Sequence, residues 1–92
     1  MANAIITLKI MPEDPSVDLK HIETEAKKKI AAFAGAGETR VEIEPIAFGL
    51  KAVKIMFVTD EKKGGTDSLE AEINKIDGVN SVEVIDVRRA IG

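Results

Sequence analysis

Two short stretches of the chain hold residue types that could bind a partner. Phe48 stands between Ala47 and Gly49 in a short connection between two strand-like segments. An aromatic side chain in such a loop either packs back on the sheet or packs on a partner. Arg88 and Arg89 stand near the C-terminal end, and guanidinium groups bind carboxylates or phosphates. Because successive strand residues point to opposite faces, only one of the two arginines is expected to face a given partner.

The remaining reactive residue types do not form a catalytic pattern. His21 is the one histidine, and its place near Asp18 and Glu25 is typical of a solvated helix residue. The chain has no cysteine, which excludes disulfides, thiolate zinc sites and a cysteine nucleophile. The segment 64–67 (GGTD) could hold a phosphate at a helix N-terminus, but Asp67 would repel an anion there. We expect neither a metal nor a cofactor.

Length and charge narrow the class of protein. The 92 residues fit one domain, residues 1–92. Thirteen basic against sixteen acidic residues give a net charge of −3, which argues against a nucleic-acid footprint over the whole chain. The longest N-terminal apolar run, residues 4–11, is too short for a membrane span and follows no basic segment. We expect a cytoplasmic protein.

The pattern of apolar residues predicts six elements. Alternation over residues 4–11 places Ile6, Leu8 and Ile10 on one face of a strand. A helix follows over residues 19–33, with Asp18 as its N-cap. Residues 40–44 form a second strand that ends at Pro45, and residues 50–59, apolar on both faces, form a central strand.

The last two elements complete the topology. A second helix begins near residues 66–67, where Asp67 and Glu70 resemble a capping box. It ends near Gly78, which is expected in a left-handed conformation. Residues 81–87 form the last strand. The order predicts an α+β, ferredoxin-like split βαβ fold (βαββαβ), with a four-stranded antiparallel sheet and two helices on one face.

Three ordered motifs resemble a known family. They are residues 44–55 (EPIAFGLKAVKI), 64–70 (GGTDSLE) and 78–89 (GVNSVEVIDVRR). Together they resemble the elongation factor 1-beta family in its archaeal form, over essentially the whole chain. The resemblance implies a ferredoxin-like exchange domain. It also implies a guanine-nucleotide exchange factor for translation elongation factor 1-alpha, which releases GDP so that GTP can rebind and makes no covalent bond.

The resemblance also implies which residues bind the GTPase. Phe48 and Gly49 match the family's Pro-x-x-Phe/Tyr-Gly hairpin, and Lys51 lies beside it. Eukaryotic members carry a lysine close to the C-terminus that reaches the Mg²⁺ site. That position falls on residue 91 or 92, which are Ile and Gly here. Either Arg88 or Arg89 takes the cationic role, or exchange relies on Phe48.

Two other functions fit the same fold, because fold alone does not decide function. An RNA-binding module would carry aromatics on the open sheet face, and the outward positions of residues 5–11 and 52–58 have none. A small-molecule-sensing or regulatory module would use that face to dimerise. We expect a monomer or weak dimer that binds elongation factor 1-alpha, with no nucleic acid and no membrane as partners.

Overall fold

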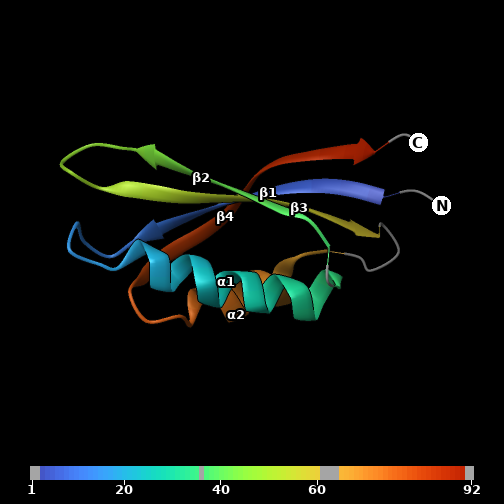
Figure 1. The fold of residues 1–92 in the computed structure, drawn as a ribbon, viewed down its shortest axis with the longest axis horizontal. Helices are drawn as coiled ribbons and strands as arrows, with labels where there is room; N and C mark the ends of the chain where they lie inside the picture. The colour runs from blue at the N-terminus through green and yellow to red at the C-terminus, as the bar shows by residue number, and fades with distance from the viewer. Residues whose placement is uncertain (1–2, 36, 61–64, 91–92) are drawn as a thin grey trace.

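The computed structural model describes residues 3–35, 37–60 and 65–90. The chain forms β1 (Asn3–Pro12), α1 (Leu19–Ala34), β2 (Thr39–Pro45), β3 (Lys51–Asp60), α2 (Asp67–Asn74) and β4 (Val79–Ala90). The strands make one sheet in the order β2-β3-β1-β4, and every neighbouring pair is antiparallel. Both helices lie on the same side of the sheet (Figure 1). The predicted ferredoxin-like topology is confirmed.

The core lies between the sheet and the two helices. The predicted alternation of β1 is confirmed, since Ile6, Leu8 and Ile10 are buried. The helices contribute an apolar face each, and a fully buried aliphatic side chain stabilises a fold by about 1.5–3 kcal/mol. The other core residues of β3 and the helices are Val53, Ile55, Phe57, Ile22, Ala26, Ile30, Leu69 and Ile73.

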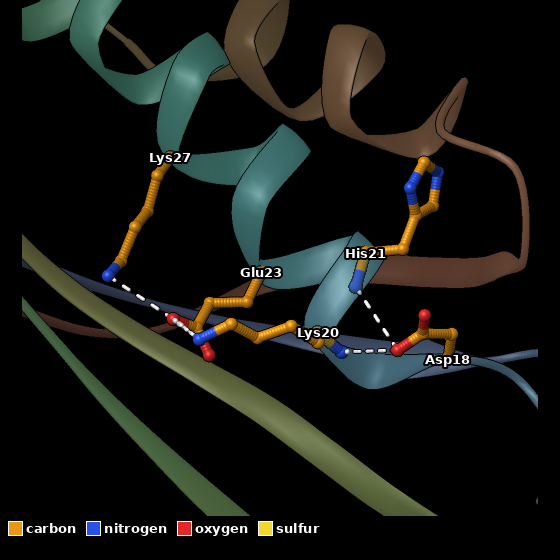
Figure 2. Close-up of polar contacts among 5 residues, drawn as sticks. All are labelled: Asp18, Lys20, His21, Glu23 and Lys27. Carbon is orange, nitrogen blue, oxygen red and sulfur yellow. Dashed lines mark hydrogen bonds and ion pairs between the residues drawn. The ribbon is translucent and has the colours of Figure 1, made fainter.

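The start of α1 follows the predicted cap. The Asp18 carboxylate accepts hydrogen bonds from the backbone N–H groups of Lys20 (3.0 Å) and His21 (3.4 Å), which satisfies two donors that the first turn leaves free. One turn further on, the Glu23 carboxylate lies 3.2 Å from the Lys27 ammonium and 4.0 Å from that of Lys20. Figure 2 shows this first turn, with the exposed His21 ring directed away from both pairs.

One cap and one boundary differ from the prediction. Helix α2 begins near residues 66–67 as predicted, with Thr66 as its N-cap, but no side chain caps it through a hydrogen bond. The predicted capping box is therefore wrong, because Glu70 accepts a hydrogen bond from the Thr66 hydroxyl (2.9 Å) instead of reaching the backbone. The last strand is also longer than residues 81–87, since it runs over Val79–Ala90 with a register shift opposite Thr7 and Leu8. Such a bulge lets an edge strand stay paired while its path bends.

Thr59 has a buried hydroxyl that makes no hydrogen bond within the described part of the chain. A buried polar group without a partner costs about 1–3 kcal/mol. Valine has nearly the same shape, so we expect Thr59→Val to raise the free energy of unfolding by about 1 kcal/mol, measured by urea denaturation. Thr7→Val, at the other buried threonine, is the matched control and should gain less. A destabilised Thr59→Val would contradict the prediction.

Candidate functional site

The connection between β2 and β3 presents an aromatic side chain to solvent. We call residues 46–50 the hairpin tip. The Leu50 N–H donates to the Ala47 carbonyl (3.1 Å), and the Ile46 N–H donates to the Leu50 carbonyl (2.8 Å). The two residues in the centre of the turn, Phe48 and Gly49, have φ of 58° and 78°. Positive φ at both central residues is the requirement of a type I′ hairpin turn.

Phe48 occupies an unfavourable position on two counts. It is 95% exposed, so the interpretation in which it packs back on the sheet is wrong. It is also the one non-glycine residue with positive φ among those described, and that conformation costs an L-residue about 1–2 kcal/mol. Strain and exposed aromatic area together are typical of a residue kept for contact with a partner.

Lys51 begins β3 directly behind the hairpin tip, and its side chain is exposed. The three candidates Phe48, Gly49 and Lys51 therefore lie together at one end of the sheet. They form a small surface with an aromatic group at its apex and a cation at its base.

The two arginines lie at the other end of the sheet. Arg88 is the register partner of Ile5, and Arg89 is the partner of Ala4. The Arg88 side chain is on the open face, where its Nε lies 2.9 Å from the Asp86 carboxylate. Arg89 points to the helix side, because its partner Ala4 belongs to the core. The expectation that the two face opposite sides is confirmed.

The structure therefore does not bring the two groups of candidates together. From Lys51 to Val58, the β3 residue level with Arg88, the strand rises about 23 Å at about 3.3 Å per residue. The long axis of the molecule is 42 Å. In Figure 1 the β2–β3 connection and the end of β4 are at opposite sides of the picture. The predicted topology already implied this separation, because β3 and β4 are both antiparallel to β1 and so parallel to each other.

The open face of the sheet carries cross-strand pairs of charge. Lys9 and Lys54 are direct register partners, and both are three-quarters buried. The Glu44 carboxylate lies 3.8 Å from the Lys9 ammonium and 3.3 Å from that of Lys54. Because like charges opposite each other destabilise a strand pair, Glu44 holds two lysines that would otherwise repel.

Removing this bridging charge has a measurable consequence. We expect Glu44→Gln to lower the free energy of unfolding by about 0.5–1 kcal/mol at low salt, with most of the loss recovered as salt screens the lysines. Urea denaturation at two ionic strengths measures this. Glu38→Gln, one residue before β2, is the control, because Glu38 is exposed and belongs to neither of the ion pairs that join Glu44 to the two lysines. Equal and salt-independent losses in both variants would contradict the bridge.

Other kinds of site find no support in the described residues. Within residues 3–35, 37–60 and 65–90, no three His, Cys, Asp or Glu side chains group as metal ligands. His21 is exposed, as predicted. Gly64, the first residue of the segment 64–67 that was considered and disfavoured as a phosphate site, lies outside the described residues, as do residues 91–92. No helix of the described chain is long and apolar enough to cross a membrane.

The fold and the surface at its end define a class: a small ferredoxin-like α+β domain that presents an aromatic side chain on a hairpin. The sequence identifies the member of that class. Residues 5–90 match the EF-1 guanine nucleotide exchange domain, and the chain belongs to this family.

Relatives named elongation factor 1-beta match the chain over nearly its full length. Those of Methanobrevibacter smithii and Methanothermobacter thermautotrophicus are 44% and 40% identical, over 97% of this chain and 98% of theirs. That of Staphylothermus marinus is 39% identical over the same shares. These relatives place the chain in guanine nucleotide exchange during translation elongation.

A solved structure supports the fold alone. The C-terminal domain LarC2 of a cyclometallase involved in the synthesis of a lactate racemase cofactor superposes with a TM-score of 0.64. The alignment covers 99% of this chain and 58% of that one, at 12% identity. At this identity the likeness concerns backbone topology, which unrelated functions share.

Proposed function

We propose that this chain promotes the release of GDP from elongation factor 1-alpha, with the hairpin tip as its principal contact. The observation that carries the proposal is Phe48, 95% exposed and held at a φ of 58°. Exposure of a strained aromatic is unfavourable in the free protein, and burying it in a partner recovers that cost. The exchange role of the family supports the choice of a GTPase as partner. The chain acts by contact and makes no covalent bond.

The mechanism is a reciprocal coupling between two ligands of the GTPase. A factor that binds the nucleotide-free GTPase more tightly than the GDP-bound form must weaken GDP binding by the same factor. The phosphate-binding loop and Mg²⁺ hold the nucleotide. A contact that disturbs either by about 3 kcal/mol accelerates release by roughly a hundredfold, since about 1.4 kcal/mol is tenfold.

The arginine end of the sheet is the proposed second contact. The Arg88 side chain is 74% exposed and its Nε is paired with Asp86. A guanidinium has five N–H donors, so its other nitrogens can bind acceptor oxygens near the nucleotide site. Arg89, on the other side of the strand, is the alternative. A partner that contacts both Phe48 and Arg88 must extend along most of the 42 Å axis.

The test is the release of a fluorescent GDP analogue from purified elongation factor 1-alpha. We expect the chain to accelerate release over a range of Mg²⁺ concentrations. The double variant Arg88→Ala/Arg89→Ala should lower the rate and change its dependence on Mg²⁺ if the arginine end acts near the nucleotide. An unchanged release rate with the wild-type chain would exclude the proposed function.

Two further functions are less well supported. The open sheet face has partly exposed apolar residues, Met56, Val58 and Ile85, which a regulatory dimer could bury. However, charged pairs such as Lys54 with Glu44 interrupt them, so we propose a monomer or weak dimer. None of the described side chains on that face is aromatic, which leaves an RNA-binding module without a stacking surface. Sedimentation equilibrium separates the dimer from the proposed monomer.

A further inference from the structure

Three segments that are distant in sequence meet at the Phe48 end of the molecule. They are the hairpin tip, the β1–α1 loop (residues 13–18) and the turn between α2 and β4 (residues 75–78). Figure 1 shows them together at the left of the picture, while both chain ends are at the right. A partner that approaches Phe48 along this end therefore also meets the β1–α1 loop.

The β1–α1 loop is fixed to the turn behind it. The Glu13 N–H donates to the Gly78 carbonyl (2.8 Å), and the Val17 N–H donates to the Asp14 carbonyl (3.3 Å). The Val17 side chain packs on the core and lies directly over Gly78. The loop is thus held by a backbone hydrogen bond and an apolar contact.

Asp14 organises the exposed part of the loop. Its Oδ1 accepts hydrogen bonds from the Ser16 backbone N–H (2.8 Å) and from the Ser16 hydroxyl (2.5 Å). The hydrogen bonds from Ser16 hold the pKa of the Asp14 carboxyl below its ordinary value. The carboxylate is therefore charged, exposed and fixed in place at neutral pH.

Pro15 lies next to the hairpin tip. Gly49 has no Cβ, and one added there would come within ordinary van der Waals distance of the Pro15 ring, 3.8 Å from its Cβ and 3.9 Å from its Cγ. The two residues line one surface hollow of about 180 Å³ together with Asp14 and Lys51. The loop and the tip are therefore one continuous surface.

We propose that the β1–α1 loop and the hairpin tip form a single contact surface for the GTPase, in which Pro15 is a positioning residue for Phe48 and the Asp14 carboxylate faces a basic patch of the partner. The inference rests on the proposed function, because the occupant is the same GTPase. It adds a second segment of this chain to the contact. It also specifies the partner's surface, which is apolar where it covers Phe48 and basic where it meets the loop.

The charges at this end favour a basic partner. The exposed carboxylates Glu13, Asp14 and Asp77 outnumber the two exposed lysines there, Lys51 and Lys75. The hydrogen bond from the Glu13 N–H to the Gly78 carbonyl brings Glu13 to the turn that holds Asp77. The whole chain carries a net charge of −3. Complementary charge beside an apolar contact raises the association rate and fixes the orientation of a complex.

The first experiment measures the positioning by Pro15 in the free protein and needs no partner. Hydrogen exchange of the Leu50 and Ile46 amides reports on the two hydrogen bonds of the hairpin tip. We expect Pro15→Ala to accelerate both by roughly threefold to tenfold, because the substitution removes the apolar ring that lies next to the tip. The Ile55 amide in the centre of β3 should be unchanged. Unchanged hydrogen exchange at the Leu50 and Ile46 amides would overturn the positioning role of Pro15, whatever the GDP-release assay shows.

The second experiment measures how Pro15 acts on GDP release from elongation factor 1-alpha. Pro15→Ala should lower kcat/KM by about threefold to tenfold in the wild-type background and have no further effect on Phe48→Ala. A residue that acts only through Phe48 gives this non-additive result. Equal losses in both backgrounds would show that Pro15 does not position Phe48.

The third experiment tests the charge of the loop. Asp14→Asn keeps an oxygen for the Ser16 hydrogen bonds and removes the charge. We expect it to slow association with the GTPase about twofold to fourfold at low salt and to have little effect at about 0.5 M salt. Glu38→Gln removes the same charge from an exposed residue at the other end and should change nothing.

The outcomes separate this inference from the proposed function. If the wild-type chain accelerates GDP release and Asp14→Asn matches Glu38→Gln at every salt concentration, the loop contact is wrong while the function stands. If the wild-type chain leaves release unchanged, the proposed function fails and the partner half of the inference fails with it. Even then, the hydrogen-exchange result alone decides whether Pro15 positions the hairpin tip.

Discussion

Phe48→Ala is expected to lower kcat/KM for GDP release by about thirtyfold, which corresponds to roughly 2 kcal/mol of lost contact energy. The reason is that Phe48 is an aromatic side chain at the apex of the site and has no packing partner in the free protein, with 95% of its surface exposed. For the same reason the free energy of unfolding should change by less than about 0.5 kcal/mol. The release assay and urea denaturation measure the two quantities.

A second substitution at this position sets function and stability in opposite directions. Asparagine tolerates positive φ better than phenylalanine, and the φ here is 58°. We expect Phe48→Asn to raise the free energy of unfolding by about 0.5–1 kcal/mol and to lose exchange activity like Phe48→Ala. A stabilised, inactive variant would show that the strain is kept for function.

The matched controls are close in the structure. Ile43→Ala removes another exposed apolar side chain of the same hairpin and should leave the release rate unchanged. Phe48→Tyr keeps the ring and should retain most of the activity. If Phe48→Ala exchanged nucleotide as fast as the wild-type chain, the principal contact would have to lie elsewhere, and the arginine end of the sheet would become the first candidate.

The fold could be predicted from the sequence because its signals are local and repeated. Ile6, Leu8 and Ile10 alternate, and the structure buries all three. Asp18 stands where a helix must begin, and its carboxylate accepts the two hydrogen bonds expected of a cap. Each of these patterns needs only neighbouring residues, so tertiary structure had little opportunity to override it.

The missed features depend on contacts between segments. The sequence correctly predicts the start of α2 near residues 66–67. It does not show that the Thr66 hydroxyl donates a hydrogen bond to Glu70, which leaves the helix without the predicted capping box. The extra length of β4 depends on a bulge at its pairing with β1, which has no signal in β4 alone. For the site, the sequence predicted Phe48 as a contact residue, but the hollow that Pro15 and Gly49 line together joins two segments far apart in the chain.

The turn between α2 and β4 carries the largest predicted effect on stability. Gly78 has a φ of 92°, and a Cβ there would lie 2.7 Å from Cγ1 of Val17. An L-residue at this φ costs about 1–2 kcal/mol, and overpacking against a half-buried, β-branched side chain costs about 1–3 kcal/mol more. We expect Gly78→Ala to lower the free energy of unfolding by about 2–5 kcal/mol, measured by urea denaturation.

The chain offers a control that separates the two costs. Gly35 has a φ of 91°, and a Cβ there would meet nothing within 4 Å. Gly35→Ala should therefore show the backbone cost alone, about 1–3 kcal/mol at its φ of 91° and ψ of 170°. In the double variant Val17→Ala/Gly78→Ala the overlap is gone, so its loss should be smaller than the sum of the single losses by about 1–3 kcal/mol.

This prediction also bears on the contact surface. The Gly78 carbonyl accepts the hydrogen bond from Glu13 that fixes the β1–α1 loop, so a shifted turn should displace the loop. Gly78→Ala should then accelerate amide exchange at the hairpin tip, whereas Gly35→Ala, at the far end of α1, should not. Equal stability losses in Gly78→Ala and Gly35→Ala would mean that Val17 moves aside without cost, and the turn would then not be the fixed support that the close packing indicates.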